Sequence, residues 1–325
     1  MRSNRDDRTR TTAGLAIEVT LRYPLPWFAP GDFGVHEAYS PALRLIGTPG
    51  DRGLAVARLG GWPTTAADPQ RAATALRFLT FWAILGDSPA FAEAELLAAV
   101  RGSDVLAPDA PSALRAWWEV ARRYRTAMGP GWCARLADHF ADWLAATRCE
   151  AQLRARIAAG GSYPAREDLL PVRVASVGVG PAIDFLEYVH DCPLPLAVRN
   201  HPAHAAVRRY AARLVAIQDD LVGVADDLAA HRPNLFGCLL RVEGLSPTAA
   251  ASEIEALHDE SLCGLTGASQ LLRAEFPRCE RVTAWLRAVQ ALCHGFARWH
   301  VAGALDRRPP ALPAGPALAI EIEYV

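Results

Sequence analysis

The chain has 325 residues, of which 51% are hydrophobic, and its formal net charge is −1. This apolar fraction is sufficient for a sizeable core. The balanced charge lacks the basic excess with which nucleic-acid-binding proteins contact phosphate backbones. The arginine-rich N-terminus does not resemble a signal peptide, and no apolar run is expected to span a membrane. The sequence therefore favours a cytoplasmic protein with neither a nucleic-acid partner nor a membrane span.

Every basic residue other than histidine is arginine, because the sequence contains no lysine. Schiff-base catalysis by a lysine of this chain is therefore excluded. The seven cysteines are dispersed, and none forms a Cys-x-x-Cys pair. This pattern predicts free thiols rather than a disulfide framework or a zinc site.

Two short strands are predicted at the ends of an otherwise helical chain. Residues 1–13 are polar and charged, which predicts a disordered tail, and residues 14–325 are expected to form a single α-helical domain. Residues 15–23 and 318–324 have strand-like patterns, and they either pair as an isolated hairpin or dock separately. Between them, helices are predicted at residues 69–85, 90–100, 110–126, 131–158, 182–190, 203–231, 234–243, 247–274 and 278–305.

Capping residues mark several of the predicted helix ends. Asp68 and Ser246, each followed by a proline, are typical N-caps. Gly102, Gly160 and Gly244 are typical of helix stops. Several helices are apolar on more than one face, which is expected of an all-α bundle that encloses an apolar cavity.

The most informative stretch is an acidic turn inside the predicted helix at residues 203–231, which is otherwise apolar. Asp219 and Asp220 are followed seven positions later by Asp226 and Asp227. Residues seven positions apart point the same way on a helix, so the four carboxylates form two pairs. Carboxylates two turns apart can share a hard cation such as Mg²⁺. A solvated acidic face is the alternative interpretation of the same pattern.

The residues around this turn strengthen the metal interpretation. The sequence HRPNLF follows at residues 231–236, and GLSPT follows at residues 244–248. Upstream, Arg173 lies 46 positions before Asp219 and shortly before SVG at residues 176–178. A guanidinium can bind a phosphate through two parallel hydrogen bonds. A helix C-cap is the ordinary alternative for an arginine before such a break.

This succession resembles the bacterial class I terpene synthases over roughly residues 69–305. Their (N/D)DLxSxxxE metal motif matches Asp219 and Asp220 directly, with Gly223 in place of the serine and Asp227 in place of the glutamate. The resemblance implies a class I terpenoid synthase-like bundle with a Mg²⁺ site at these four positions. A water molecule could fill the place of the missing hydroxyl at Gly223, which would weaken metal binding without abolishing it.

The same resemblance assigns roles upstream of the metal motif. It implies that Arg173 senses the diphosphate of the substrate and that Ser176 is the linker. Val177 would be the effector, whose backbone carbonyl helps to draw off the leaving group.

The first metal motif of the family departs from its DDxxD pattern. Here the corresponding helix ends in GDSPA at residues 86–90, which leaves Asp87 without the leading carboxylate. Glu93 and Glu95 are nearby substitutes. Because ligands are missing from both motifs, we expect fewer than three Mg²⁺ ions.

The C-terminal Arg-Tyr pair that closes over the diphosphate in the family is also absent. Its place falls at Leu305 and Asp306. Arg307 and Arg308 lie just beyond, and Arg298 lies two turns earlier, so any of these could supply the positive charge. Of these, Arg307 is the candidate for binding substrate.

Cyclisation of a carbocation requires a dry cavity lined by aromatic faces. The candidates for the cavity wall lie on three predicted helices. Ordinary core packing is the alternative role for most of them, and the histidines are expected to be core residues rather than bases. They are Phe78, Phe81 and Trp82, then Phe185 and Tyr188, and finally Trp299 and His300; the histidines expected in the core are His294 and His300.

Two hypotheses follow for the function. In the first, metal at the acidic turn and Arg173 ionise a linear prenyl diphosphate, and the aromatic cavity folds the cation into a terpene hydrocarbon or alcohol. In the second, the scaffold has lost this chemistry and binds an isoprenoid or a protein partner. The spacing of Arg173 favours the first hypothesis, whereas the changed first motif favours the second. We prefer the first, and the sequence leaves open whether the protein is a homodimer.

Overall fold

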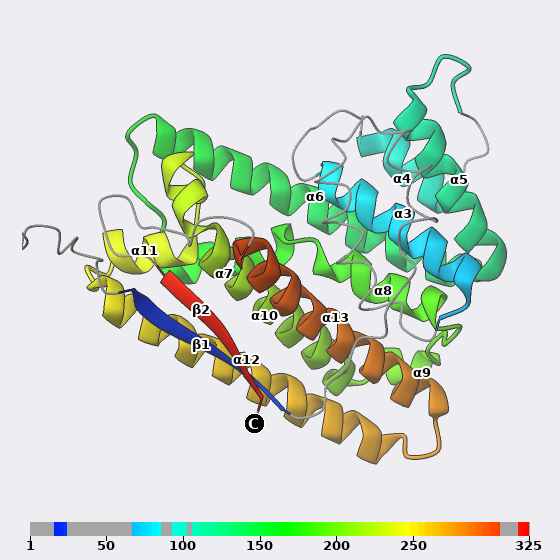
Figure 1. The fold of residues 1–325 in the computed structure, drawn as a ribbon. Coiled ribbons are helices and arrows are strands. Elements are labelled where there is room, and N and C mark those ends of the chain that lie inside the picture. The colour runs from blue at the N-terminus through cyan, green and yellow to red at the C-terminus, as the bar shows by residue number, and fades with distance from the viewer. Residues whose placement is uncertain (1–15, 25–66, 86–92, 103–105, 306–317, 325) are drawn as a thin grey trace, which may run out of the picture.

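The computed structural model describes residues 16–24, 67–85, 93–102, 106–305 and 318–324. Within them the chain is an all-α bundle with one small sheet, as predicted (Figure 1). The disordered tail predicted at residues 1–13 lies outside the described residues, and the single-domain organisation stays a prediction. The helices are α3 (Pro69–Leu85), α4 (Glu93–Arg101), α5 (Ser112–Ala127), α6 (Pro130–Ala158), α7 (Arg166–Ser176), α8 (Val179–Val189), α9 (Leu196–Arg199), α10 (Pro202–Ala229), α11 (Leu235–Arg241), α12 (Pro247–Glu275) and α13 (Glu280–Leu305).

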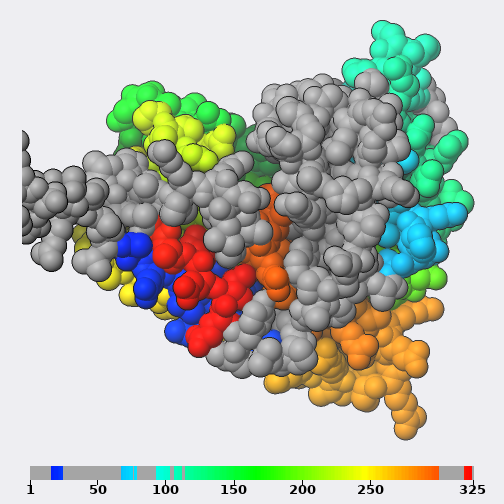
Figure 2. All heavy atoms as spheres, viewed as in Figure 1, coloured from blue at the N-terminus to red at the C-terminus, as the bar shows by residue number. Residues whose placement is uncertain are grey.

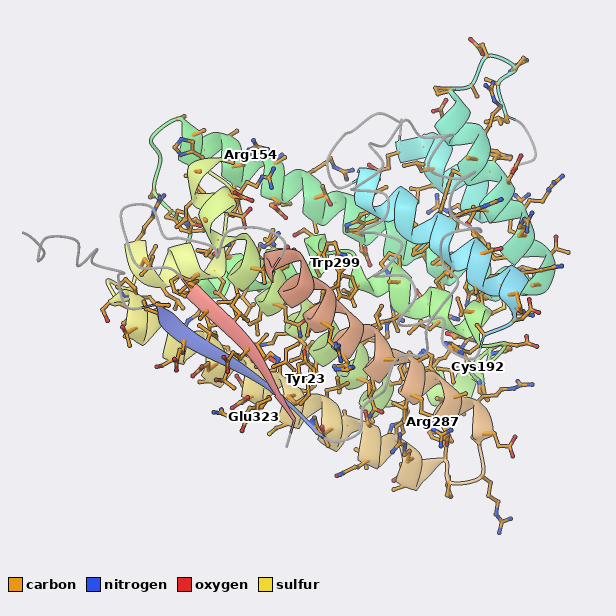
Figure 3. All side chains as sticks on the ribbon, in the orientation of Figure 1. Tyr23, Arg154, Cys192, Arg287, Trp299 and Glu323 are labelled. Atoms are coloured by element: carbon orange, nitrogen blue, oxygen red, sulfur yellow. The ribbon has the colours of Figure 1, made fainter. Side chains whose placement is uncertain are left out.

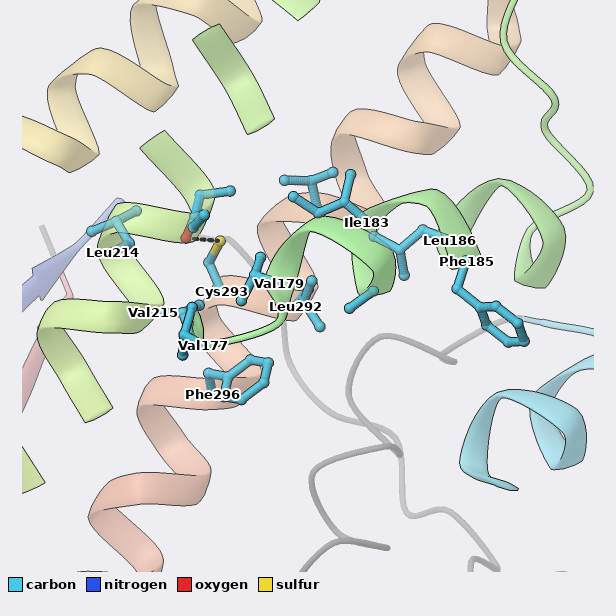
Figure 4. Packing of buried hydrophobic residues seen from close by; sticks show 14 of the residues in the cluster. Val177, Val179, Ile183, Phe185, Leu186, Leu214, Val215, Leu292, Cys293 and Phe296 are labelled. Carbon is cyan, nitrogen blue, oxygen red and sulfur yellow. Dashed lines mark hydrogen bonds between the residues drawn. The ribbon is translucent and has the colours of Figure 1, made fainter. Parts of the chain in front are cut away.

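The centre of the bundle is occupied by α8 and α10. Ten of the eleven residues of α8 are buried, in agreement with its mostly apolar sequence, and they include the two carboxylates Asp184 and Glu187. Its neighbour α10 packs against α7, α8, α12 and α13. Figure 4 shows Val179 of α8, Val215 of α10 and Phe296 of α13 meeting in this core. The central position of α10 places its acidic turn at the junction of several helices.

Several predicted caps are confirmed. The Asp68 carboxylate accepts hydrogen bonds from the first turn of α3, and the Ser246 hydroxyl accepts one from Ala249 at the start of α12. Gly160 and Gly244 have φ angles of +79° and +67°, which few residues other than glycine adopt. These glycines therefore end α6 and the segment after α11 for the expected reason.

The helix α7 was not predicted. Pro171 lies near its middle, and an interior proline removes one backbone donor and usually ends or kinks a helix. Here Pro171 is on the exposed side of α7, where water can satisfy the unpaired carbonyl. On the opposite side, Leu169 and Arg173 are buried and fix the helix against the bundle.

The two predicted strands pair, but the expectation of a hairpin was wrong. Strand β1 (Ile17–Tyr23) and strand β2 (Leu318–Tyr324) form a parallel two-stranded sheet, with Ile17 opposite Leu318 and Tyr23 opposite Tyr324. A hairpin is antiparallel, whereas strands separated by a long connection can align in parallel. The sheet packs on α12 and α13, and both strands reach the surface in Figure 2.

One described segment is long and apolar enough to cross a membrane, contrary to the expectation from sequence. It comprises residues 166–189, within which an 18-residue stretch has a mean hydropathy of 1.5, and 61% of that stretch is buried inside the protein. Gly178, with a φ of +75°, divides it into α7 and α8. Its apolar character is therefore accounted for by the central position of α8 in the bundle.

A buried network of charges joins α6, α8 and α10. The carboxylate of Asp184 is completely buried and accepts hydrogen bonds from Arg208 at 2.7 Å and Arg135 at 3.3 Å, and it contacts His139. Arg135 also pairs with Glu187 at 2.6 Å. Burial alone would raise the pKa of Asp184, but its partners Arg208, His139 and Arg135 outweigh burial and hold this pKa below its usual value.

Replacing Asp184 with asparagine is expected to lower the free energy of unfolding by about 3–5 kcal/mol at pH 7, because Arg208 would lose its buried counter-charge and Arg135 would keep only Glu187. Because the pKa of Asp184 is lower in the folded state, its ionised form stabilises the protein above the unfolded pKa of about 4. This contribution is lost as the pH falls below that value, so the gap between wild type and variant should narrow in acid. Urea unfolding at several pH values measures both effects.

The matched control is Asp142→Asn, which changes an exposed aspartate of α6. It should alter the stability by less than about 0.5 kcal/mol. Equal stability of Asp184→Asn and wild type at pH 7 would contradict a structural role for the network.

Candidate active site

The candidate site is built where α7 crosses the acidic turn of α10. Arg173, on α7, is 5% exposed, and its guanidinium contacts carboxylates from two other helices. Its Nη2 donates to Asp219 at 2.7 Å, its Nε donates to Asp220 at 2.7 Å, and its Nη1 donates to Glu150 of α6 at 2.8 Å. The 46-residue spacing noted in the sequence therefore corresponds to a direct contact between Arg173 and Asp219.

The four carboxylates of the turn divide into two pairs, as their spacing predicts. Asp220 and Asp227 are buried, whereas Asp226 is exposed and the side chain of Asp219 is 46% exposed. The two buried carboxylates face the body of the protein. Asp219 is the carboxylate that is in contact with both Arg173 and solvent.

Asn234 connects the two buried carboxylates. Its side-chain amide donates to the backbone carbonyl of Asp220 at 2.7 Å and to the carboxylate of Asp227 at 2.8 Å. Its own carbonyl oxygen accepts from Gly237, which makes Asn234 the N-cap of α11. The second oxygen of Asp220 accepts from the backbone N–H of Leu235 at 2.6 Å. The segment after α10 therefore fixes the orientation of the acidic turn.

Burial makes this turn costly to ionise. It raises the pKa of Asp220 to about 7, against the opposing effect of Arg173, and it raises the pKa of Asp227 to about 6, against the hydrogen bond from Asn234. Burial also opposes the charge on Arg173, but Asp220, Glu150 and Asp219 outweigh it and hold the pKa of Arg173 well above its usual value. The guanidinium therefore stays charged.

The donor set suits a hard divalent cation, although the side chains do not converge on one point. Carboxylate oxygens are the ligands that Mg²⁺ prefers. In the described part of the chain, no three Asp, Glu, His or Cys side chains stand in a metal-binding arrangement. The guanidinium of Arg173 bridges Asp219 and Asp220 instead. A metal at Asp219 would therefore exchange with a hydrogen bond of Arg173.

Gly223 lies between Asp219 and Asp227 on α10 and carries no ligand of its own. A Cβ atom at this position would lie 2.9 Å from Oδ2 of Asp227. The carboxylate of Asp227 therefore leans over Gly223, into space that a serine side chain would occupy.

The predicted linker and effector lie at the break between α7 and α8. The hydroxyl of Ser176 is 3.4 Å from Nη1 of Arg173, and the backbone carbonyl of Ser176 accepts a 2.8 Å hydrogen bond from the indole of Trp143 on α6. Val177 is buried and caps α7 through its N–H to the carbonyl of Arg173. Figure 4 shows Val177 beside Phe296. The three residues of the expected triad therefore lie together, and their catalytic roles stay predictions.

Other predicted ligands lie partly outside the described residues. This applies to Asp87, Arg307 and Arg308. Glu93 pairs with Arg148 of α6, and Glu95 is exposed on α4.

The described aromatic candidates lie in the core. Phe78 stacks on Phe185, with ring centroids 4.3 Å apart, and meets Phe140 edge-on. Trp299, labelled in Figure 3, is partly buried against the core from α13. His294 is buried, and burial lowers its pKa to about 4. The side chains of Phe81, Trp82 and His300 are outside the description, so the enclosed apolar cavity stays a prediction.

Sequence reasoning missed three residues that organise the site. Glu150 and Trp143 come from α6, whose sequence carries no motif. Tyr163 was also missed; its hydroxyl donates to the carbonyl of Asn234 at 2.9 Å. Only the HRPNLF segment, which contains Asn234, gave a signal.

With this geometry established, comparison with known proteins identifies the family. Residues 90–263 match the family model described as "Terpene synthase family 2, C-terminal metal binding", and this match covers more than half of the chain. The chain belongs to this family. The matched region contains Glu150, Arg173 and the whole acidic turn, and the family description supports binding of a divalent metal.

Individual relatives agree with this assignment. The Terpene cyclase 4 of Gibberella fujikuroi is 29% identical over 97 residues, which is 30% of this chain and 27% of the relative. The match thus spans about a quarter of that curated relative.

Solved structures share the fold. An a-eudesmol synthase matches with a TM-score of 0.73 and 20% identity over 86% of this chain and 99% of its own. The linalool/nerolidol synthase of Streptomyces clavuligerus matches with a TM-score of 0.75 and 18% identity over the same shares of the two chains. At these identities the likeness establishes the class I terpenoid synthase fold.

Replacing Asp227 with asparagine is expected to stabilise the metal-free protein by about 1–3 kcal/mol at pH 8. Because the pKa of Asp227 is raised in the fold from 3.8 to about 6, the folded state binds this proton more tightly than the unfolded chain does. Stability is therefore lost as the pH rises from about 4 to about 6. The advantage of the variant should vanish near pH 4.

Urea unfolding of metal-free wild type and variant at pH 4.5 and pH 8 measures this difference. A variant that is less stable than wild type at pH 8 would show that Asn234 and Arg232 compensate fully for the buried charge.

Proposed function

We propose that the protein is a class I terpene cyclase that uses Mg²⁺ and Arg173 to ionise a linear prenyl diphosphate. The observation that carries the proposal is the contact of Arg173 with Asp219 and Asp220, which places a buried cation beside two of the candidate metal ligands. Membership of the terpene synthase family supports the same reaction. The product would be a terpene hydrocarbon or alcohol, and the pathway would be isoprenoid biosynthesis.

The charges at the site support this division of labour. Glu150, Asp219, Asp220 and Asp227 face two guanidiniums, those of Arg173 and Arg232. A diphosphate would add further negative charge, and buried unpaired charges cost several kcal/mol each. The carboxylates therefore need cations before a diphosphate can enter. Mg²⁺, when bound, would neutralise the leaving group and act as a Lewis acid.

The side chains of this protein would perform the remaining steps. Arg173 offers a planar fork of donors that matches two phosphate oxygens. Asp219 would hold a metal ion together with Asp227, and Asn234 orients the carboxylate of Asp227. Ser176 and Val177 lie at the break after Arg173, so a shift of the guanidinium would be transmitted to the backbone that faces the leaving group. Phe81, Trp82, Trp299 and Arg307 stay candidates for contact with the substrate.

Fewer than three metal ions are expected, because Gly223 supplies no hydroxyl ligand and the first motif lacks its leading carboxylate. We further propose a cytoplasmic location, which the seven free cysteines support. The alternative function is a scaffold that binds a diphosphate or an isoprenoid without turnover. The side chain of Asp219 is 46% exposed, which supports the enzyme because a metal ion from solvent can reach this carboxylate.

The proposal is tested by incubating the protein with geranyl, farnesyl and geranylgeranyl diphosphates, with and without Mg²⁺. We expect volatile terpene products that depend on the metal. Arg173→Ala should lower the rate at least tenfold, since one lost charge-assisted contact is worth about 1.4 kcal/mol or more. Gas chromatography with mass spectrometry detects the products.

The control variant is Arg287→Ala, which removes an exposed arginine of α13 (Figure 3) and should leave the rate unchanged. Binding of the diphosphates without any product would favour the scaffold instead.

Two substitutions at Gly223 distinguish the effect of adding a hydroxyl ligand from the steric effect of adding a Cβ atom. Both Gly223→Ala and Gly223→Ser place a Cβ atom against the Asp227 carboxylate. Only serine adds a hydroxyl ligand for the metal. We expect the alanine variant to need more Mg²⁺ for half-maximal activity than wild type, and the serine variant to need less than the alanine variant.

Activity measured over a series of Mg²⁺ concentrations provides this comparison. The same Mg²⁺ requirement in both variants would contradict a ligand position at residue 223.

A further inference from the structure

Every nitrogen of the Arg173 guanidinium already has an acidic partner. Its Nε donates to Asp220, its Nη2 donates to Asp219, and its Nη1 donates to Glu150 at 2.8 Å. The guanidinium is a rigid fork of five N–H groups. Nη2 also lies against Asp220, and Nη1 lies 3.4 Å from the Ser176 hydroxyl, so a bidentate phosphate contact has to replace existing partners. An incoming diphosphate must therefore displace at least one carboxylate.

The three carboxylates differ in how readily they can be displaced from the Arg173 guanidinium. Asp220 is 1% exposed, and its other oxygen is held by the backbone N–H of Leu235. Releasing it would leave a buried charge without a counter-charge. The side chain of Glu150 is 23% exposed and comes from a different helix, α6, so water can solvate it when it leaves. Asp219 is the candidate metal ligand and would be occupied by the metal.

We propose that Glu150 competes with the diphosphate for Nη1 of Arg173 and thereby sets the affinity of the site for its anionic ligand. In the metal-free protein Glu150 is a positioning residue that holds the guanidinium between α6 and α10. When the anion binds, a phosphate oxygen takes the place of the Glu150 carboxylate. The inference rests on the proposed function, because it assumes that Arg173 binds a diphosphate.

The same exchange bears on product release. Inorganic diphosphate is the leaving group of the proposed reaction, and it would have to depart from Arg173 before the next cycle. The return of Glu150 to Nη1 would assist this departure. Loss of the negative charge at residue 150 should therefore strengthen binding of both substrate and product, while slowing release of the product.

The decisive measurement is isothermal titration of the full chain with inorganic diphosphate at saturating MgCl₂. Glu150→Gln keeps the size of the side chain and removes its charge. It should lower the Kd for diphosphate by roughly threefold to tenfold, because a charge-assisted hydrogen bond is exchanged for a weaker neutral one. Glu150→Asp keeps the charge on a shorter side chain, and its Kd for diphosphate should lie between those of Glu150→Gln and wild type.

The matched control is Glu260→Gln, which removes the charge from another interhelical ion pair, with Arg213 at 2.6 Å. Its Kd should equal that of wild type. Steady-state turnover gives a second readout: Glu150→Gln should lower both KM and the inhibition constant for inorganic diphosphate, whereas a merely structural loss would raise KM.

The outcomes are distinguishable. Tighter binding by Glu150→Gln, with Glu260→Gln unchanged and all variants unfolding at similar urea concentrations, is the expected result. Unchanged or weaker binding by Glu150→Gln, while wild type binds diphosphate, overturns this inference alone. If neither wild type nor any variant binds diphosphate in the presence of MgCl₂, the proposed function fails and this inference fails with it.

Discussion

The arrangement of the site depends on one buried cation that is shared by carboxylates from two neighbouring helices. Arg173 is held on α7, and its partners come from α6 and α10. Because a buried charge is tolerated only with its counter-charges in place, the three helices are tied together at this end of the bundle. The guanidinium that fixes this packing is also the group best suited to bind a phosphate. Under the proposed function, ligand binding would draw on the same contacts that stabilise this packing.

A second buried charge network involves the same helices, α6 and α10, but its central carboxylate differs in solvent exposure. Asp184 is completely enclosed between Arg208 of α10 and Arg135 of α6, whereas Asp219 is 46% exposed at its side chain. An enclosed carboxylate cannot exchange partners with a solute, but a half-exposed one can. Since α6 and α10 contribute to both networks, the enclosed network fixes these two helices against each other, and under the proposed function the partly exposed network would bind the ligand.

The sequence was informative where a pattern is local and poor where contacts are distant. Helical periodicity located the long helices, and the spacing from Arg173 to Asp219 indicated a contact that the structure contains. Helix α7 was not predicted because a proline inside a helix usually ends it. Pro171 is tolerated because it lies on the exposed side of the helix. Glu150 could not be found, since its relation to Arg173 depends on how two helices cross. Asn234 stood in a suggestive segment, but its link to Asp227 needed coordinates.

The parallel pairing of β1 with β2 has a consequence for the order in which the molecule is assembled. Arg22 of β1 bonds Glu323 of β2 across 301 positions of sequence. During synthesis from the N-terminus, β1 leaves the ribosome long before its partner exists, and contacts of such separation form late. Before β2 is made, β1 can already be held by α10, whose Gln218 donates to the hydroxyl of Tyr23, and by α12, whose Glu255 accepts a hydrogen bond from the backbone N–H of Thr20. The helical bundle can therefore serve as the template on which the sheet is completed last.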